Sequence, residues 1–219
     1  MNQQKWQPIF QQFLNEQMAH DPAHDGSHIQ RVVHNAVKFA ELEGARLAVV
    51  FPAAWLHDCV IVPKDSPLRS KASTMAAETA VTFLQSQSYP AQYMDPIAHA
   101  IAAHSFSAQI PPETIEAKVV QDADRLDAIG AVGIARAFII GGKLGRPIYN
   151  QTDPFCQERQ PDDFAATVDH FYTKLFKLAD TMQTEAGQRE AKIRTQFMYD
   201  FLGQLKRELL LYPEGDPPF

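Results

Sequence analysis

A histidine and an aspartate, His57 and Asp58, stand inside an apolar stretch at residues 51–60 (FPAAWLHDCV). Burying an unpaired charge costs several kcal/mol, so a carboxylate in such a stretch must be paired, neutralised or bound to a cation. Most buried polar groups are simply hydrogen-bonded within the core. The pair therefore fits either a hydrogen-bonded core pair or a metal site, and the rest of the sequence has to decide between them.

The composition is that of an ordinary globular protein. Of the 219 residues 45% are hydrophobic and 21% charged, which is enough for one substantial core. The net charge of -6, without a run of Lys or Arg, argues against broad binding to nucleic acid or to an anionic membrane. The N-terminus carries no apolar signal core, no run of 18 apolar residues exists, and the two cysteines form no spaced framework. We therefore expect a cytoplasmic protein with free thiols.

Apolar side chains recur at helical spacing along most of the chain, and no strand-like alternation of useful length is present. We predict an all-α protein, with one helical domain over residues 1–211 and a loose tail over residues 212–219. The stretch 143–163 is expected to be a long loop, to which the sequence assigns no role. Helices are expected near residues 6–18 and 28–43, in a segment that carries His57 and Asp58 and stops before residue 63, near residues 70–87, 91–106, 113–124 and 128–142, and in a closing pair of long helices near residues 164–182 and 193–209.

Four polar residues in or beside apolar helical stretches stand out together: His28, His57, Asp58 and Asp122. Two neutral imidazoles and two carboxylates would bind one divalent cation and leave positions for water. This mixed donor set suits an octahedral Mn, Fe, Ni or Mg ion better than a closed structural zinc site. The four residues are too far apart for one local motif, so three helices must converge.

Three stretches resemble a known family. Residues 24–32 (HDGSHIQRV), 55–58 (WLHD) and 121–127 (QDADRLD) are similar to the H…HD…D signature of the HD-domain metal-dependent phosphohydrolases. The similarity covers about residues 22–138, and the closing helices resemble those of the small stand-alone bacterial members. Such proteins are all-helical and hydrolyse phosphomonoester, phosphodiester or nucleotide phosphoanhydride bonds. The resemblance implies that the metal ligands are His28, His57, Asp58 and Asp122.

The chain departs from two branches of that family. Some nucleotidase members carry a glutamate three residues after the HD aspartate, where this chain has Ile61. The paired adjacent histidines of the cyclic-dinucleotide phosphodiesterase branch are also absent. We therefore expect one divalent metal ion (Mn, Ni, Co, Fe or Mg) and do not transfer the specificity of either branch.

Three residues are expected to take part in the reaction itself. Asp58 would serve both as a ligand and in catalysis. His104 would donate a proton or a hydrogen bond, and Asp127 would orient a ligand or a water molecule.

Substrate contacts are expected mainly from the loop and helix start that follow His57 and Asp58. Basic side chains, helix-start amides and a serine hydroxyl together make a phosphate cradle. The expected substrate-binding residues are Lys64, Arg69, Arg31 and Ser73. A solvated surface loop is the alternative interpretation of this segment.

The sequence thus predicts a metal-dependent phosphohydrolase that acts on a nucleotide or a small organic phosphate through a metal-activated water, with nucleoside triphosphates first among the substrates. An alternative is a catalytically idle HD-like module that binds a nucleotide or a protein partner. A third possibility is a purely structural zinc site. The oligomeric state is not predicted.

Overall fold

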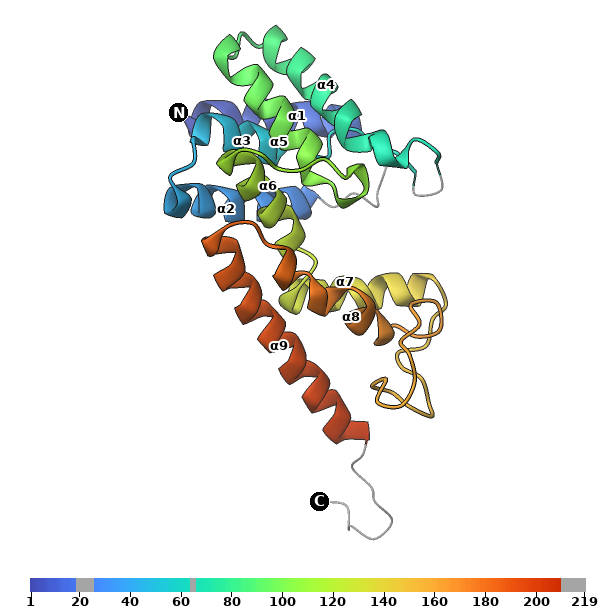
Figure 1. Cartoon of the computed structure of the whole chain (residues 1–219). Helices are drawn as coiled ribbons and strands as arrows, with labels where there is room; N and C mark the ends of the chain where they lie inside the picture. The colour runs from blue at the N-terminus through green and yellow to red at the C-terminus, as the bar shows by residue number, and fades with distance from the viewer. Residues whose placement is uncertain (19–25, 64–65, 210–219) are drawn as a thin grey trace. The chain divides into compact units, whose positions relative to one another are not determined.

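A computed structural model describes residues 1–18, 26–63 and 66–209. In these ranges the regular elements are helices and 3-10 turns (Figure 1), which confirms the all-α class. The chain divides into two compact units. Unit 1 comprises Met1–Asp127 with Met182–Gly187, and unit 2 comprises Ala128–Thr181 with Gln188–Phe219. The single domain expected over residues 1–211 stays a prediction, and the expected tail at residues 212–219 lies outside the described residues.

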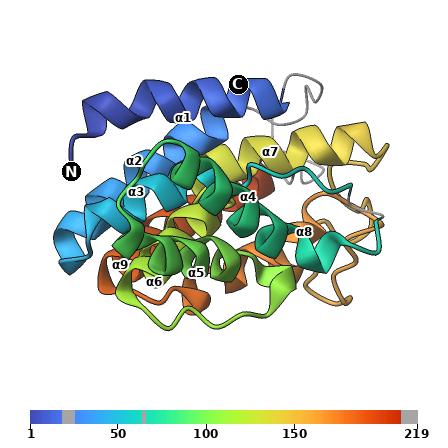
Figure 2. The same ribbon diagram turned by 90° about the horizontal axis from the view of Figure 1, so that it is seen from above.

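Unit 1 is built around a short helix that is apolar on all sides. From Val49 to Leu56 every residue of this helix, α3, is buried. A helix without a polar face has to be enclosed, and α3 contacts α1, α2, α4, α5 and α6. Helices α4 and α5 run side by side (Figure 2). The elements of unit 1, with 3-10 turns written η, are α1 (Gln3–Met18), α2 (Gly26–Glu43), α3 (Leu47–Leu56), η1 (Arg69–Lys71), α4 (Ala72–Ser86), η2 (Ala91–Tyr93), α5 (Met94–His104), η3 (Phe106–Ala108) and α6 (Ile115–Leu126).

Helix α3 ends earlier than the sequence predicts. His57 is its C-cap, and Asp58 lies in the turn that follows. The backbone amide of Cys59 donates to the carbonyl of Leu56 at 3.2 Å, and the His57 ring turns back to the carbonyl of Ala54 at 2.9 Å. These bonds satisfy carbonyl groups at the end of the helix. The pair is therefore displayed at a helix end and does not lie within the helix.

Unit 2 contains α7 (Gly130–Lys143), α8 (Asp169–Thr173), η4 (Leu175–Lys177), η5 (Ala179–Thr181) and most of α9 (Glu185–Leu209). Helix α9 agrees with the second of the two long closing helices expected from the sequence. The first one is replaced by the five-residue α8 and two 3-10 turns. The residues just before α8 are hydrogen-bonded to the preceding loop, because the amides of Thr167 and Val168 donate to the carbonyls of Pro147 and Ile148. Among the described helices, none is long and apolar enough to cross a membrane.

Candidate metal centre

Two imidazole rings face each other at the ends of two helices in unit 1. His28 lies in the first turn of α2, and His57 caps α3. Their Nε2 atoms are 3.4 Å apart. Nδ1 of His57 lies 2.9 Å from the carbonyl oxygen of Ala54, which can only accept, so this nitrogen carries the hydrogen. Nδ1 of His28 is likewise bonded to a carboxylate oxygen of Asp127 at 2.8 Å. In the neutral form of each ring the lone pair is therefore on Nε2, and the two Nε2 atoms lie next to each other.

Two carboxylates complete this cluster. Asp58 Oδ2 is 3.8 Å from His57 Nε2. Asp124 Oδ1 is 3.5 Å from His28 Nε2 and 3.7 Å from His57 Nε2. Neighbouring donors at such separations correspond to donor–cation distances of about 2.1–2.7 Å, within or close to the range for divalent ions. The side chain of Asp58 is 41% exposed and that of Asp124 is 26% exposed, so a ligand can approach the cluster from the side of these two carboxylates.

The pKa values of the two rings reflect their different surroundings. Burial lowers the pKa of His57, which favours the neutral ring that binds a metal. Burial also acts to lower the pKa of His28, but the hydrogen bond with Asp127 and the charge of Asp124 raise it on balance. The carboxylates thus create a field that favours a positive charge at this point. Chemistry, spacing and charge of the donors all fit a divalent cation.

Asp122, expected as the fourth ligand, lies elsewhere. Its fully buried carboxylate accepts hydrogen bonds from the amide of Gln183 (2.9 Å), the amide of Thr184 (2.8 Å) and the Thr184 hydroxyl (2.7 Å). Two positions along a helix are about 200° apart, so Asp122 and Asp124 leave α6 on opposite sides. We therefore correct the expectation and give the fourth position to Asp124. The sequence held a signal for this, because Asp124 lies on the same face of α6 as Asp127, one turn away.

Asp127, predicted to orient a ligand or a water molecule, lies next to the His28 ring. The fully buried carboxylate of Asp127 accepts a hydrogen bond from Nδ1–H of His28 and another from Nε–H of Arg31, the latter at 2.6 Å. Burial acts to raise the pKa of Asp127, but these two donors hold it well below its ordinary value. Arg31 also bonds to the Ser27 hydroxyl at 2.7 Å. The guanidinium, expected to contact substrate, is thus engaged with side chains of the protein.

The structure brings His104 to the same cluster. Its ring centroid is 4.9 Å from that of His57, and its Nε2 atom is 3.5 Å from Asp58 Oδ1. Nδ1 donates to the carbonyl of Ile101 at 2.6 Å, which leaves Nε2 directed at the carboxylate. Burial acts to lower the pKa of His104, but the hydrogen bond with Asp58 and nearby negative charge raise it on balance. His104 is therefore placed to hold a proton beside Asp58.

The expected substrate contacts are only partly described. Lys64 lies outside the described residues. Arg69 is exposed in η1 and donates to the carbonyl of Val62 at 3.0 Å. Ser73 is buried in the first turn of α4, and its hydroxyl has no hydrogen-bond partner among the described residues. Both η1 and α4 contact η3, which closely follows His104 in the chain. This segment therefore lies near the end of α5 that carries His104.

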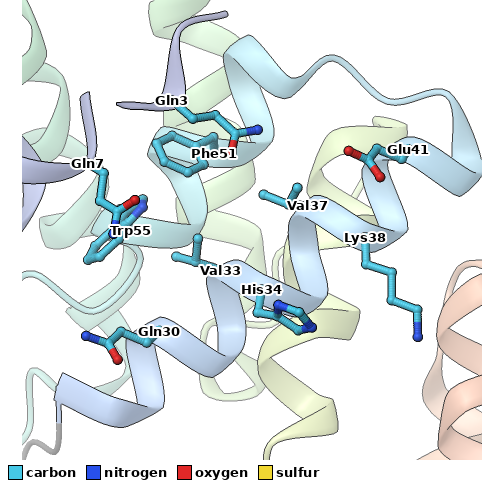
Figure 3. A pocket seen from close by; sticks show the side chains of 10 residues that line it. All are labelled: Gln3, Gln7, Gln30, Val33, His34, Val37, Lys38, Glu41, Phe51 and Trp55. Atoms are coloured by element: carbon cyan, nitrogen blue, oxygen red, sulfur yellow. The ribbon is translucent and has the colours of Figure 1, made fainter. Parts of the chain in front are cut away.

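A separate cavity of about 450 Å³ is lined by side chains of α1, α2 and α3 (Figure 3). It includes Gln30 and Trp55, which lie two positions from His28 and His57. Two positions correspond to about 200° around a helix. The cavity is thus on the other side of α2 and α3 from the metal donors, and the approach to the donors is the side where Asp58 and Asp124 are exposed.

Comparison with known proteins places the chain in a family. Residues 26–129 match the HD domain. The Bacillus subtilis protein YpgQ is 34% identical over 190 residues, which cover 85% of this chain and 84% of YpgQ. The chain therefore belongs to the HD-domain family, as the sequence stretches predict.

Solved structures agree with this assignment. An HD-superfamily hydrolase from Bacillus thuringiensis superposes with a TM-score of 0.74 at 32% identity, covering 95% of this chain and 98% of the other. The structure of Bacillus subtilis YpgQ in complex with ADP superposes with a TM-score of 0.68 at 33% identity, covering 94% and 100%. The similarity extends well beyond the matched HD domain and includes unit 2.

Proposed function

We propose that this protein is a metal-dependent phosphohydrolase that acts on a nucleotide. The observation that carries the proposal is the pair of imidazoles whose Nε2 atoms lie 3.4 Å apart, each with its other nitrogen bonded to an acceptor. Two lone pairs directed at one point repel each other unless a positive charge lies there. A hydrogen bond between a protonated and a neutral ring would also relieve this repulsion. The oxygens of Asp58 and Asp124, which lie 3.5–3.8 Å from the same Nε2 atoms on partly exposed side chains, favour a metal ion over such a pair.

The cation would be held by His28, His57, Asp58 and Asp124. When bound, such an ion lowers the pKa of a water ligand toward 7 and offsets negative charge on phosphoryl oxygens. The ligand set uses nitrogen and oxygen donors without thiolates, which favours Mn, Fe, Ni, Co or Mg over a structural zinc ion.

The side chains around the cluster have separate tasks in this proposal. Asp58 presents one oxygen to His57 and the other to His104, so both contacts restrict its orientation. His104 holds a proton on Nε2, from which it can donate to an oxygen of the substrate. Lys64, Arg69 and Ser73, with the first amides of α4, would bind the phosphate groups.

The substrate class is proposed from the relatives. YpgQ has been crystallised in complex with ADP, and this chain matches that structure over 94% of its length. The side chains of Asp58 and Asp124 are partly exposed, so a nucleotide would approach from this side, and the nearby segment with Arg69 would bind its phosphates. Nucleoside triphosphates are the first compounds to test.

The test is a panel of nucleoside mono-, di- and triphosphates and simple phosphate esters, each assayed with Mn, Ni, Co and Mg. We expect metal-dependent release of phosphate or pyrophosphate, lost in His28→Ala and His57→Ala. A matched control is His34→Ala, which removes an exposed histidine from the same helix as His28 and should leave activity unchanged.

Other outcomes would favour the alternatives. Turnover that persists in His57→Ala, in a protein that carries no metal, would contradict the proposal. No turnover on any compound, together with thermal stabilisation by nucleotides, would favour an idle binding module. Tight stoichiometric zinc with melting on chelation would indicate a structural site.

A further inference from the structure

Arg31 follows His28 by one helical turn, so the two side chains leave the same face of α2. The guanidinium grips a single carboxylate with two nitrogens: Nε lies 2.6 Å from Asp127 Oδ1, and Nη2 lies 3.0 Å from Asp127 Oδ2. The third nitrogen, Nη1, donates to the Ser27 hydroxyl at 2.7 Å. All three nitrogens of Arg31 are thus bonded within the protein.

Asp127 in turn joins Arg31 to a metal donor. Its side chain is completely buried, and Oδ2 accepts both from Arg31 and from Nδ1 of His28, the latter at 2.8 Å. A carboxylate fixed by two bonds from one guanidinium cannot rotate away from the ring. The hydrogen bonds therefore form one chain from Arg31 through Asp127 to His28.

We propose that Arg31 is a positioning residue, which acts through Asp127 to fix the tautomer and the orientation of the His28 ring for the cation. This inference rests on the proposed metal site. It replaces the expectation that Arg31 binds substrate. A guanidinium suits this task because its planar fork matches both oxygens of a carboxylate, whereas a lysine offers one point of charge.

The first test measures metal affinity, which does not depend on turnover. Metal-free protein is titrated with Mn²⁺ by calorimetry for the wild type, Arg31→Ala, Arg31→Lys and Asp127→Asn. Loss of such an outer partner weakens metal binding by about 10- to 100-fold. We expect Arg31→Ala and Asp127→Asn to weaken binding in this range. Arg31→Lys should fall between Arg31→Ala and the wild type.

A double variant tests whether Arg31 acts through Asp127. If it does, Arg31→Ala adds nothing once Asp127 is changed, and the double variant binds Mn²⁺ as weakly as Asp127→Asn alone. If the two residues act independently, the fold-changes multiply. Multiplying effects would overturn the proposal.

Arg46 provides a matched control for loss of an arginine–carboxylate pair. Its Nε atom lies 2.7 Å from Oε1 of the buried Glu116, and in the described part of the chain neither side chain is hydrogen-bonded to His28, His57, Asp58 or Asp124. Arg46→Ala should lower the melting temperature and leave the affinity for Mn²⁺ within twofold of the wild type. A similar loss of affinity in this variant would show that the effect of Arg31→Ala is merely structural.

The substrate-binding alternative predicts a different pattern. If Arg31 contacts phosphate, Arg31→Ala raises KM at saturating metal and leaves the affinity for Mn²⁺ unchanged. That result would overturn the proposal and leave the metal site intact.

A final measurement is made on metal-free protein. It tests the positioning role of Arg31 separately from the proposed phosphohydrolase function. The ¹⁵N spectrum of the His28 ring should show the hydrogen on Nδ1 in the wild type and a mixture of tautomers in Arg31→Ala. An unchanged tautomer in Arg31→Ala would overturn the positioning role, whether or not the wild type binds metal or hydrolyses phosphates.

Discussion

Asp122 and Asp124 lie two positions apart on α6, and changing each to alanine should affect a different property of the protein. Asp124→Ala removes a donor that lies 3.5 and 3.7 Å from the two imidazoles. Asp122→Ala removes a buried acceptor of three donor groups near the start of α9, namely the amides of residues 183 and 184 and the hydroxyl of Thr184. The first variant should lose the metal, and the second should lose stability.

The size of the second effect follows from the hydrogen bonds. A buried donor left without an acceptor costs about 1–3 kcal/mol. Some relaxation of the three donors gives a total of about 3–6 kcal/mol for Asp122→Ala. For a protein of this size each kcal/mol shifts Tm by about 2–4 °C, so the expected fall is about 6–24 °C. Asp124 is partly exposed, and its removal should change the stability of the metal-free protein by less than about 1 kcal/mol.

The assay combines thermal unfolding of metal-free protein with a calorimetric titration of Mn²⁺. Asp124→Ala should melt near the wild type and show no Mn²⁺ binding at concentrations that saturate the wild type. Asp122→Ala should melt much lower and, below its melting temperature, keep most of its affinity. Asp122→Asn is the conservative control, with an intermediate Tm because one acceptor oxygen remains. The reverse pattern, with metal lost in Asp122→Ala and kept in Asp124→Ala, would refute the assignment of Asp124.

Three further predictions test other parts of the structure. Burial acts to raise the pKa of Glu116, but the hydrogen bond from Arg46 lowers it on balance from its ordinary 4.5. The stability gained from the charge of Glu116 is therefore present above pH 4.5 and is lost as pH falls below it. In urea unfolding the wild type should lose its advantage over Glu116→Gln below pH 4.5, and a constant difference at all pH values would contradict this. Burial raises the pKa of Cys59 to about 12 and that of Cys156 to about 11, so iodoacetamide at pH 8 should modify both slowly in the folded protein and rapidly in urea, whereas fast labelling of the folded protein would be inconsistent with these surroundings. A Cβ on Gly187 would lie 2.4 Å from Oδ2 of Asp122, whose carboxylate is held by three hydrogen bonds. Gly187→Ala should therefore destabilise the protein by about 1–3 kcal/mol, and an unchanged Tm would contradict this.

The sequence was sufficient for the fold class and for three residues that the structure brings into one cluster able to hold a metal ion. Helical periodicity predicts the helices of unit 1 because their apolar faces are regular, and the apolar run of α3 requires a helix enclosed by others. His28, His57 and Asp58 could be chosen because each is a polar residue at the edge of an apolar stretch. Their donor atoms lie within 4.8 Å of one another in the structure.

Other features depend on contacts between distant residues. Asp122 and Asp124 are of the same residue type and two positions apart in the sequence. The hydrogen bonds of Asp122 with residues 183–184 show that Asp122 faces away from the imidazoles. The segment expected as a helix at residues 164–182 has suitable periodicity. However, Arg159 bonds to the buried Asp169 from the loop, and the backbone of Thr167 pairs with Pro147. Tertiary hydrogen bonds of this kind override local helix propensity.

The most direct test of the metal site is a crystal structure with Mn²⁺, using anomalous scattering to locate the ion. We predict one strong anomalous peak between the Nε2 atoms of His28 and His57, within about 2.0–2.6 Å of both nitrogens and of an oxygen from Asp58 and from Asp124. A peak bound instead by Asp122, or no peak near the two imidazoles at a saturating concentration of Mn²⁺, would contradict the account.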